Sequence, residues 1–224
     1  GKILILAPLA VAPQTKEEGE KFGIPVNICE SQDDIVDGIN ITNYEKIDKF
    51  TGNSFQAVVL DESSILKSFT SSTRNKLIDN FSKVPFRLAC TATPAPNDHM
   101  ELGNHSEFLG VMTRAEMLSM YFVHDGGNTA KWRLKGHAED VFWNWMASWA
   151  VFIDNPKNLD YEVNGYDLPK LNINEIIVDG DEVTSETLTL TQRRQARKES
   201  LELRCKAAAD LVNSSDEQWL VWCD

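Results

Sequence analysis

Two apolar segments that end abruptly in polar residues constrain the fold of this chain more than any other feature of its sequence. The first, Val58–Leu60, leads directly into Asp61 and Glu62, and the second, Leu88–Cys90, leads into Thr91–Pro94. Buried strands of a parallel sheet are covered on both faces, so they read as short continuous hydrophobic runs. Polar residues directly after such a run lie at the C-terminal edge of the sheet, where open α/β proteins bind their ligands. The pattern therefore predicts an α/β fold with a functional site at one sheet edge.

Five strand candidates alternate with longer connections in the N-terminal part of the chain. Two of these connections, Pro13–Phe22 and Thr70–Ser82, have helical character. Such alternation implies right-handed crossovers and a parallel sheet with helices on both faces. We therefore predict a RecA-like parallel sheet of the P-loop nucleoside triphosphatase type, followed by a helical extension. The expected strands are Ile3–Ala7, Val26–Cys29, Ile39–Thr42, Ala57–Asp61 and Phe86–Thr91.

The chain after residue 98 is expected to be mainly helical. In Ala138–Ile153, apolar residues recur at helical spacing, and we interpret them as a buried face rather than as a platform for stacked bases. They are Val141, Phe142, Trp145, Met146, Trp149 and Phe152. An acidic turn is expected at Asp179–Glu182 and a long helix over Ser185–Asn213. That helix is rich in Arg and Lys. Its basic residues form either a solvated face, balanced by Glu199 and Glu202, or a stripe that contacts nucleic-acid phosphates.

An Asp-Glu pair at the end of a buried strand suits the chemistry of a nucleoside triphosphatase. Asp61 can hold Mg²⁺ through its water shell, and Glu62 can orient or deprotonate the attacking water. The Thr91–Pro94 turn on a neighbouring strand can respond to the presence of the γ-phosphate. Each signal also has a plain interpretation, because Asp-Glu pairs occur by chance and Pro94 alone would end a strand. The order and spacing of further motifs decide between these interpretations.

Several segments, in the correct order, resemble motifs of superfamily 2 helicases, in particular Snf-type DNA translocases and their phage-encoded relatives. Ile3–Gln14 resembles motif Ia, Ile39–Glu45 resembles motif Ib, and Asp61–Ser64 resembles motif II. Thr91–Pro94 resembles motif III, and Asn97–Leu109 resembles the helix that follows it. The resemblance extends over nearly the whole chain.

The resemblance implies an ATP-dependent DNA translocase or helicase, with ATP and Mg²⁺ as cofactors and double-stranded DNA as partner. It also implies a phage or prophage gene product in the bacterial cytoplasm. The implied catalytic residues are Asp61 and Glu62, with Asp61 linked to Mg²⁺ through water, and the implied coupling residues are Ser64, Thr91 and Thr93. The implied nucleic-acid contacts are Pro8, Leu9, Gln14, Asn43, Tyr44, Lys67, Arg193, Arg194 and Arg197.

Three parts of such a motor are expected along the chain. Residues 1–110 correspond to a partial first RecA-like lobe, residues 111–205 to a helical extension and linker, and residues 206–224 to the start of a second lobe. The phosphate-binding pattern G-x-x-x-x-G-K-[ST] of motif I does not occur in the sequence. Ser64 stands where the family usually has His. We therefore expect an internal part of a longer protein that does not hydrolyse ATP alone.

Two other functions are compatible with the same motifs. The lobe could belong to the motor subunit of a restriction or repair enzyme whose nuclease lies elsewhere in the gene. It could also be a helicase-fold module that binds DNA without hydrolysing ATP. An intact phosphate-binding loop in the flanking sequence would argue strongly against the second alternative.

The composition limits how this chain can bind nucleic acid. A net charge of −12 argues against DNA affinity spread over the whole surface and leaves local basic patches as the only possible footprint. No apolar run approaches the roughly 20 residues of a membrane span, and no basic flank of a signal peptide precedes the first apolar run. The four cysteines have no CxxC spacing, which favours a reduced cytoplasmic protein and no zinc site.

Overall fold

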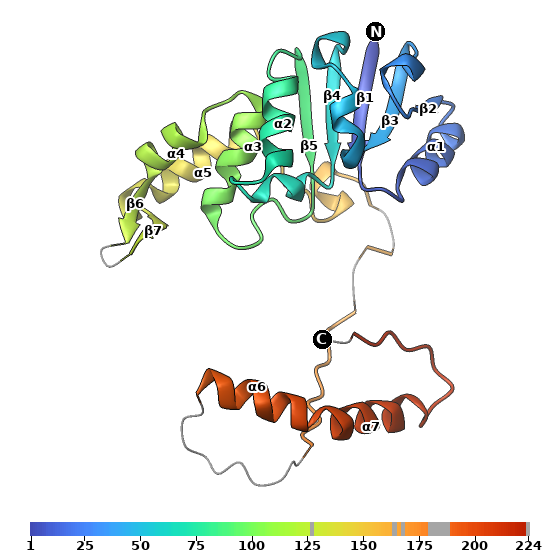
Figure 1. Ribbon diagram of the computed structural model, residues 1–224, viewed down its shortest axis with the longest axis vertical. Coiled ribbons are helices and arrows are strands. Elements are labelled where there is room, and N and C mark those ends of the chain that lie inside the picture. The colour runs from blue at the N-terminus through green and yellow to red at the C-terminus, as the bar shows by residue number, and fades with distance from the viewer. Residues whose placement is uncertain (126–127, 163–164, 167–168, 179–188, 223–224) are drawn as a thin grey trace. The chain divides into compact units, whose positions relative to one another are not determined.

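The computed structural model describes residues 1–125, 128–162, 165–166, 169–178 and 189–222 (Figure 1). The chain divides into two compact units, Gly1–Phe152 and Ile153–Asp224. This division lies well beyond residue 110, where we expected the first lobe to end. The predicted acidic turn at Asp179–Glu182 lies outside the described residues.

The first unit contains a five-stranded parallel sheet with the order β2-β3-β1-β4-β5 (Figure 1). All five predicted strands are confirmed, and the α/β fold is consistent with a RecA-like lobe. β1 and β4 have continuous apolar interiors, as expected for parallel strands covered by helices, whereas β2, β3 and β5 contain polar residues such as Asn27, Asn40 and Arg87. The strands are β1 (Lys2–Ala7), β2 (Val26–Ile28), β3 (Gly38–Asn43), β4 (Ala57–Asp61) and β5 (Phe86–Cys90).

One face of this sheet packs against two helices, α2 (Ser72–Phe81) and α3 (Leu102–Leu109). The fully buried Leu4, Leu60 and Phe81 belong to the same hydrophobic cluster. Burial of each such side chain contributes roughly 1.5–3 kcal/mol. Near the opposite edge, α1 (Ala12–Lys21) packs on β2 and buries a smaller apolar cluster.

Short 3₁₀ turns connect many of these elements. They are η1 (Gln32–Asp34), η2 (Tyr44–Lys49), η3 (Gly52–Ser54), η4 (Ser63–Lys67), η5 (His99–Glu101), η6 (Gly136–Ala138) and η7 (Pro156–Leu159). None of the helices in the described part of the chain is both long and apolar enough to cross a lipid bilayer.

A second layer of the first unit contains α4 (Arg114–Tyr121), the antiparallel hairpin of β6 (Phe122–Asp125) and β7 (Asn128–Leu134), and α5 (Glu139–Ala147). Phe142 of α5 is fully buried, and its ring lies 5.4 Å from that of Tyr121. Trp145 and Met146 of the predicted buried face pack against the same hydrophobic cluster, whereas Val141 is 57% exposed and Phe152, beyond the end of α5, is 84% exposed. The prediction of a buried face is therefore confirmed only in part. The hairpin is a correction, because we expected only helices here. Its sequence signal was Gly126-Gly127 between two strand-forming runs.

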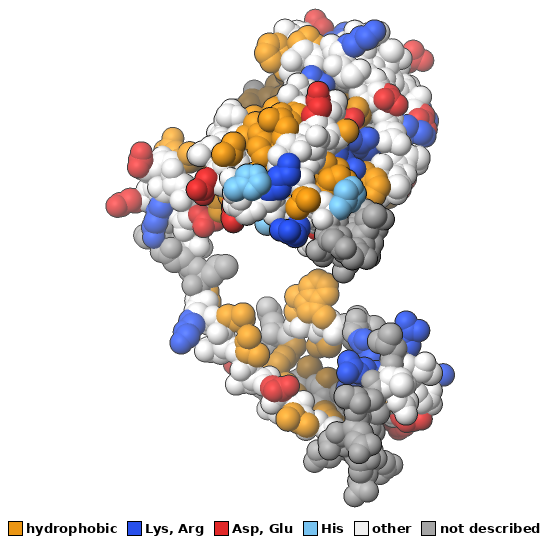
Figure 2. Space-filling model, turned by 90° about the vertical axis from the view of Figure 1, so that its left-hand side faces the viewer, with side chains coloured by type: hydrophobic (Ala, Val, Ile, Leu, Met, Phe, Trp, Pro, Cys, Tyr) orange, Lys and Arg blue, Asp and Glu red, His pale blue; other side chains and the backbone are white. Residues whose placement is uncertain are grey.

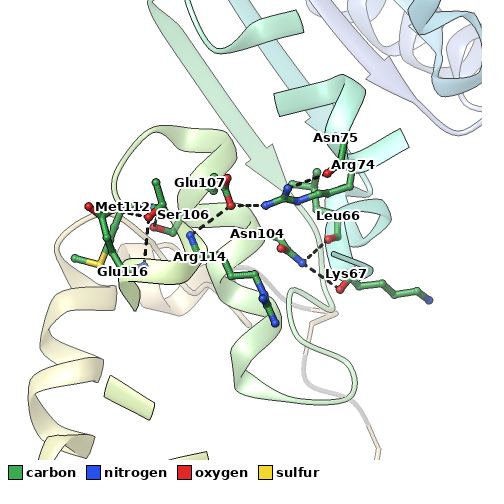
Figure 3. Close-up of polar contacts among 11 residues, drawn as sticks. Leu66, Lys67, Arg74, Asn75, Asn104, Ser106, Glu107, Met112, Arg114 and Glu116 are labelled. Atoms are coloured by element: carbon green, nitrogen blue, oxygen red, sulfur yellow. Dashed lines mark hydrogen bonds and ion pairs between the residues drawn. The ribbon is translucent and has the colours of Figure 1, made fainter. Parts of the chain in front are cut away.

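One carboxylate links the two layers of the first unit (Figure 3). Glu107 on α3 forms an ion pair with Arg74 on α2 and accepts a hydrogen bond of 3.3 Å from the backbone N–H of Arg114 on α4. The Arg114 guanidinium stacks over the ring of Phe69 at 4.2 Å. α3 and α4 approach closely because Gly103 has no side chain, and a Cβ there would lie 2.9 Å from Arg114 Cγ.

The second unit contains α6 (Leu190–Glu199) and α7 (Leu201–Val212). We predicted one long helix here, and the structure instead interrupts it at Ser200, where φ is −80° and ψ is 0°. The guanidinium of Arg204 donates to the carbonyl of Arg197 at 2.8 Å and so satisfies a backbone acceptor at the end of α6.

Strand β5 forms an edge of the sheet and exposes two large apolar side chains, Phe86 and Leu88, at 64% and 54%. An exposed apolar edge strand is a template for pairing with another chain. We predict that Leu88→Lys lowers self-association of the 224-residue chain, measured by sedimentation at increasing concentration, with little change in stability. Phe22→Lys is the control, because Phe22 is 76% exposed at the end of α1. Equal effects of both substitutions would contradict a specific role for the edge.

Candidate active site

The acidic pair lies at the C-terminal end of β4, as the sequence predicted. Glu62 has a left-handed backbone conformation with φ of 52° and ψ of 52°, which is uncommon for a residue other than glycine. The Asp61 carboxylate accepts a 3.1 Å hydrogen bond from the Glu62 N–H. This sharp turn leaves the Glu62 side chain exposed and the Asp61 side chain half-buried at the sheet edge.

Tyr44 supports this turn from the neighbouring loop. Its hydroxyl donates a 2.6 Å hydrogen bond to the backbone carbonyl of Asp61, and only 8% of the residue is exposed. Burial, followed by the charges of Asp61 and Glu62, raises the pKa of Tyr44, so the hydroxyl keeps its proton. Tyr44 therefore helps to position Asp61.

The burial of two residues argues against their predicted contact with nucleic acid. The hydroxyl of Tyr44 is occupied by the Asp61 carbonyl. The side chain of Asn43 is also buried, and its oxygen accepts from the Glu45 N–H at 3.1 Å as the N-cap of η2. Both side chains satisfy backbone groups of the protein, and their contact with nucleic acid stays a prediction.

The Thr-Pro turn after β5 contacts the acidic pair. Cys90 pairs with Asp61 in the sheet register, so Thr91 follows beside Glu62. The Thr91 hydroxyl donates to the Glu62 carboxylate at 3.4 Å, a long hydrogen bond, and accepts from the Thr93 N–H at 3.1 Å. Thr93 thus participates through its backbone, whereas Thr91 uses its side chain.

Ser63, next to the predicted coupling residue Ser64, makes a buried side-chain hydrogen bond. Its hydroxyl is fully buried and lies 3.1 Å from Nε2 of His105 on α3, whereas Ser64 is half-buried. Burial lowers the pKa of His105, although the backbone carbonyls of Glu101 and Ser63 and the Glu101 carboxylate raise it, so the imidazole is neutral at neutral pH. His105 carried no sequence signal, because its partner lies 42 positions away.

Lys67 is positioned by the same helix. The fully buried Asn104 donates to the carbonyls of Leu66 and Lys67 at 2.7 and 3.1 Å (Figure 3). The Lys67 side chain itself is exposed and extends away from this contact. Its backbone is therefore held while its charge remains accessible.

The remaining predicted contacts lie in two places. Pro8 and Leu9 form the turn after β1, closed by a 3.1 Å hydrogen bond from the Val11 N–H to the Pro8 carbonyl, and Gln14 is exposed in the first turn of α1. These residues follow the strand beside β4, so they share its sheet edge. The arginines at 193, 194 and 197 are exposed on α6 in the second unit.

The donor set suits a magnesium ion that keeps most of its water. Asp61 and Glu62 provide hard carboxylate oxygens at the sheet edge, and the Thr91 hydroxyl lies beside them. Among the described residues, no group of three or more His, Cys, Asp or Glu side chains could enclose a metal. These residues therefore fit water-mediated Mg²⁺ better than a cage of direct protein ligands.

The surface charges are mixed in the view of Figure 2. Acidic, basic and histidine side chains alternate with apolar ones on this face of the first unit, while Lys and Arg side chains gather within the second unit.

No protein-family model and no curated protein sequence matches this chain. Among solved structures, it is similar to the SWI2/SNF2 ATPase core of Sulfolobus solfataricus in complex with dsDNA, with a TM-score of 0.44 and 22% sequence identity. The similarity covers 54% of this chain and 28% of that one, so the chain spans only a minor part of that protein. A similarity of this size carries no functional assignment, and the site geometry has to support one.

The hydrogen bond of Tyr44 generates a stability prediction. Tyr44→Phe keeps the buried ring and leaves the Asp61 carbonyl without its donor, which should cost about 1–3 kcal/mol in the free energy of unfolding. Urea denaturation of the 224-residue chain measures this loss. Tyr161→Phe, at a residue that is 63% exposed, is the control and should change stability by less than about 0.5 kcal/mol. Equal losses in both variants would show that the Tyr44 hydroxyl does not support the turn.

Proposed function

We propose that this chain is part of the motor of an ATP-dependent DNA translocase or helicase. The observation that carries the proposal is the contact between the acidic turn and the Thr-Pro turn, in which Thr91 donates to Glu62 while accepting from Thr93. Two adjacent strand ends thereby join a pair of carboxylates to a loop that can move. This is the arrangement that nucleotide hydrolysis coupled to movement requires.

Asp61 would hold Mg²⁺ through water, and the ion would neutralise charge on the triphosphate. The Glu62 carboxylate is exposed and would orient or deprotonate the attacking water. The Tyr44 hydroxyl holds the Asp61 backbone, so the carboxylate keeps its direction. Rigid support of this kind is what positions catalytic groups productively.

The Thr91 hydroxyl would report the state of the nucleotide. In this structure it donates to Glu62 over 3.4 Å, a distance that leaves the bond weak and easily exchanged. A γ-phosphate oxygen is a competing acceptor for the same proton. If the Thr91 hydroxyl changed its acceptor from Glu62 to the γ-phosphate, the Thr93 backbone bonded to it would shift, and so would the loop that follows. Domain closure can amplify a local shift of this kind.

Double-stranded DNA is the proposed partner, contacted through its phosphates. Leu9, Gln14 and Lys67 are exposed on segments that follow β1 and β4. The basic residues of α6 add a second, separate group of phosphate contacts. Such contacts bind without reading sequence. Expression from a phage or prophage gene in the bacterial cytoplasm completes the proposal.

Asp61→Asn tests the catalytic assignment in the protein produced from the complete gene. Loss of the metal-linked carboxylate should lower ATP turnover by about 10²-fold or more, because such groups stabilise charge in the transition state. DNA binding should stay within a few-fold of the unmodified protein. Asp33→Asn is the control at an exposed acidic residue of η1. Turnover within a few-fold of normal in Asp61→Asn would remove the assignment.

A charge-neutralised α6 tests the DNA contact. If Arg193, Arg194 and Arg197 contact phosphates, changing all three to Gln should weaken DNA binding and flatten its dependence on salt. Each lost contact should reduce the slope of log affinity against log salt by roughly 0.7–0.9. Fluorescence anisotropy at several salt concentrations gives this slope, and an unchanged slope would make the basic residues a solvated face.

A further inference from the structure

Helix α3 is unusual because three consecutive polar residues in it are buried. Asn104 and Ser106 are fully buried, and His105 is 4% exposed. Polar groups in a protein interior need hydrogen-bond partners, so each of these residues marks a contact of structural or functional value. His105 binds Ser63 at the start of η4. Asn104 binds the end of η4, and Ser106 donates to the Met112 carbonyl at 2.8 Å (Figure 3).

Two of these residues hold both ends of the turn that follows the acidic pair. His105 bonds Ser63 at the start of η4, and Asn104 bonds Leu66 and Lys67 at its end. The turn begins at the left-handed Glu62, a conformation that persists only where its surroundings hold it. α3 thus contacts the residues that follow Glu62, while Tyr44 contacts Asp61, which precedes it.

The same helix is tied to the loop after the Thr-Pro turn. The Glu101 carboxylate, one helical turn before His105, accepts from the Asn97 side chain at 2.7 Å and from the Asn97 N–H at 3.3 Å. Glu101 is only 8% exposed. α3 and its preceding turn therefore contact both segments in which we place nucleotide chemistry, the Thr91–Asn97 loop and the acidic turn.

The imidazole of His105 makes its well-formed hydrogen bond through Nε2 and not through Nδ1. Its Nδ1 is buried, and among the described residues it has no hydrogen-bond partner of acceptable geometry. A buried polar atom without a partner is destabilising, and an apolar side chain of similar size would avoid that cost. The Nε2 atom lies 3.1 Å from the Ser63 hydroxyl, so this contact is the route by which the imidazole can position Ser63.

We propose that His105 is a positioning residue that acts through Ser63 to hold Glu62 in its catalytic direction, and that α3 transmits movement of the Thr91–Asn97 loop to this turn and to Lys67. The part that concerns catalysis rests on the proposed ATPase function. The part that concerns the turn does not, because it is a statement about which contact holds the Glu62 backbone.

The first experiment measures turnover in the protein produced from the complete gene. His105→Leu should lower kcat for DNA-stimulated ATP hydrolysis by about tenfold with a less than twofold change in KM for ATP, because it misplaces a group used in the transition state. His105→Gln should restore most of the activity, because its amide can still bond Ser63. His137→Leu, at an exposed histidine of η6, should change nothing.

The second experiment separates this inference from the proposed function. Hydrogen exchange in the 224-residue chain should become faster at residues 62–67 in His105→Leu, with β1 unchanged and global unfolding by urea near that of the unmodified chain. Unchanged exchange at residues 62–67 overturns the positioning role. Equally faster hydrogen exchange across the whole sheet in His105→Leu also overturns it, because His105 would then only stabilise the fold. A kcat in His105→Gln as low as that of His105→Leu overturns it for the same reason. Absence of ATP turnover in the unmodified protein removes the proposed function, and the exchange result then stands alone.

Discussion

The pairing of β1 with a parallel strand on each side is the constraint on which the rest of the first unit depends. Ile5 lies opposite Ile41 of β3 and Val59 of β4, so three strands run in register and end at one level. Every loop that carries a candidate site residue in the first unit leaves from this edge or from the adjoining end of β5. A slip of β4 by one residue would turn Leu60 out of the core and Asp61 into it, so the apolar core and the site select the same register.

Helix α3 has to satisfy two requirements that conflict in most helices. It covers the apolar face of the sheet, where Phe108 is 1% exposed, and it carries buried polar groups on other sides. Those polar groups are acceptable only because loops, rather than other helices, lie against them and offer backbone carbonyls or a hydroxyl. The helix thereby orders segments that have little regular structure of their own, which explains why a turn as strained as that at Glu62 can persist.

The sequence predicted what depends on local patterns. The five strands were found from short segments of apolar residues, which are continuous in β1 and β4 and interrupted by polar residues in β2, β3 and β5. The acidic pair and Thr91 were found because polar residues end β4 and follow β5. The partners of Ser63 and Tyr44 could not be found, since they lie 42 and 17 positions away and only the tertiary fold brings them together. The hairpin near residue 126 was missed because a short strand pair competes with a helical pattern in the surrounding sequence. The interruption between α6 and α7 at Ser200 was missed because it involves a single serine, a residue that also occurs within helices.

The contact of Glu107 with two arginines has a consequence for how this protein can vary. One carboxylate serves Arg74 beneath it and the backbone of Arg114 above it, so the sheet layer and the α4–α5 layer share a single anion. Arg114 also stacks on Phe69, in the loop that follows Lys67. A change at Glu107 would therefore remove the ion-pair partner of the half-buried Arg74 and the acceptor of the Arg114 N–H. The residues of the two layers that contact Glu107 cannot be substituted independently. A substitution in one layer would be tolerated only with a compensating substitution in the other.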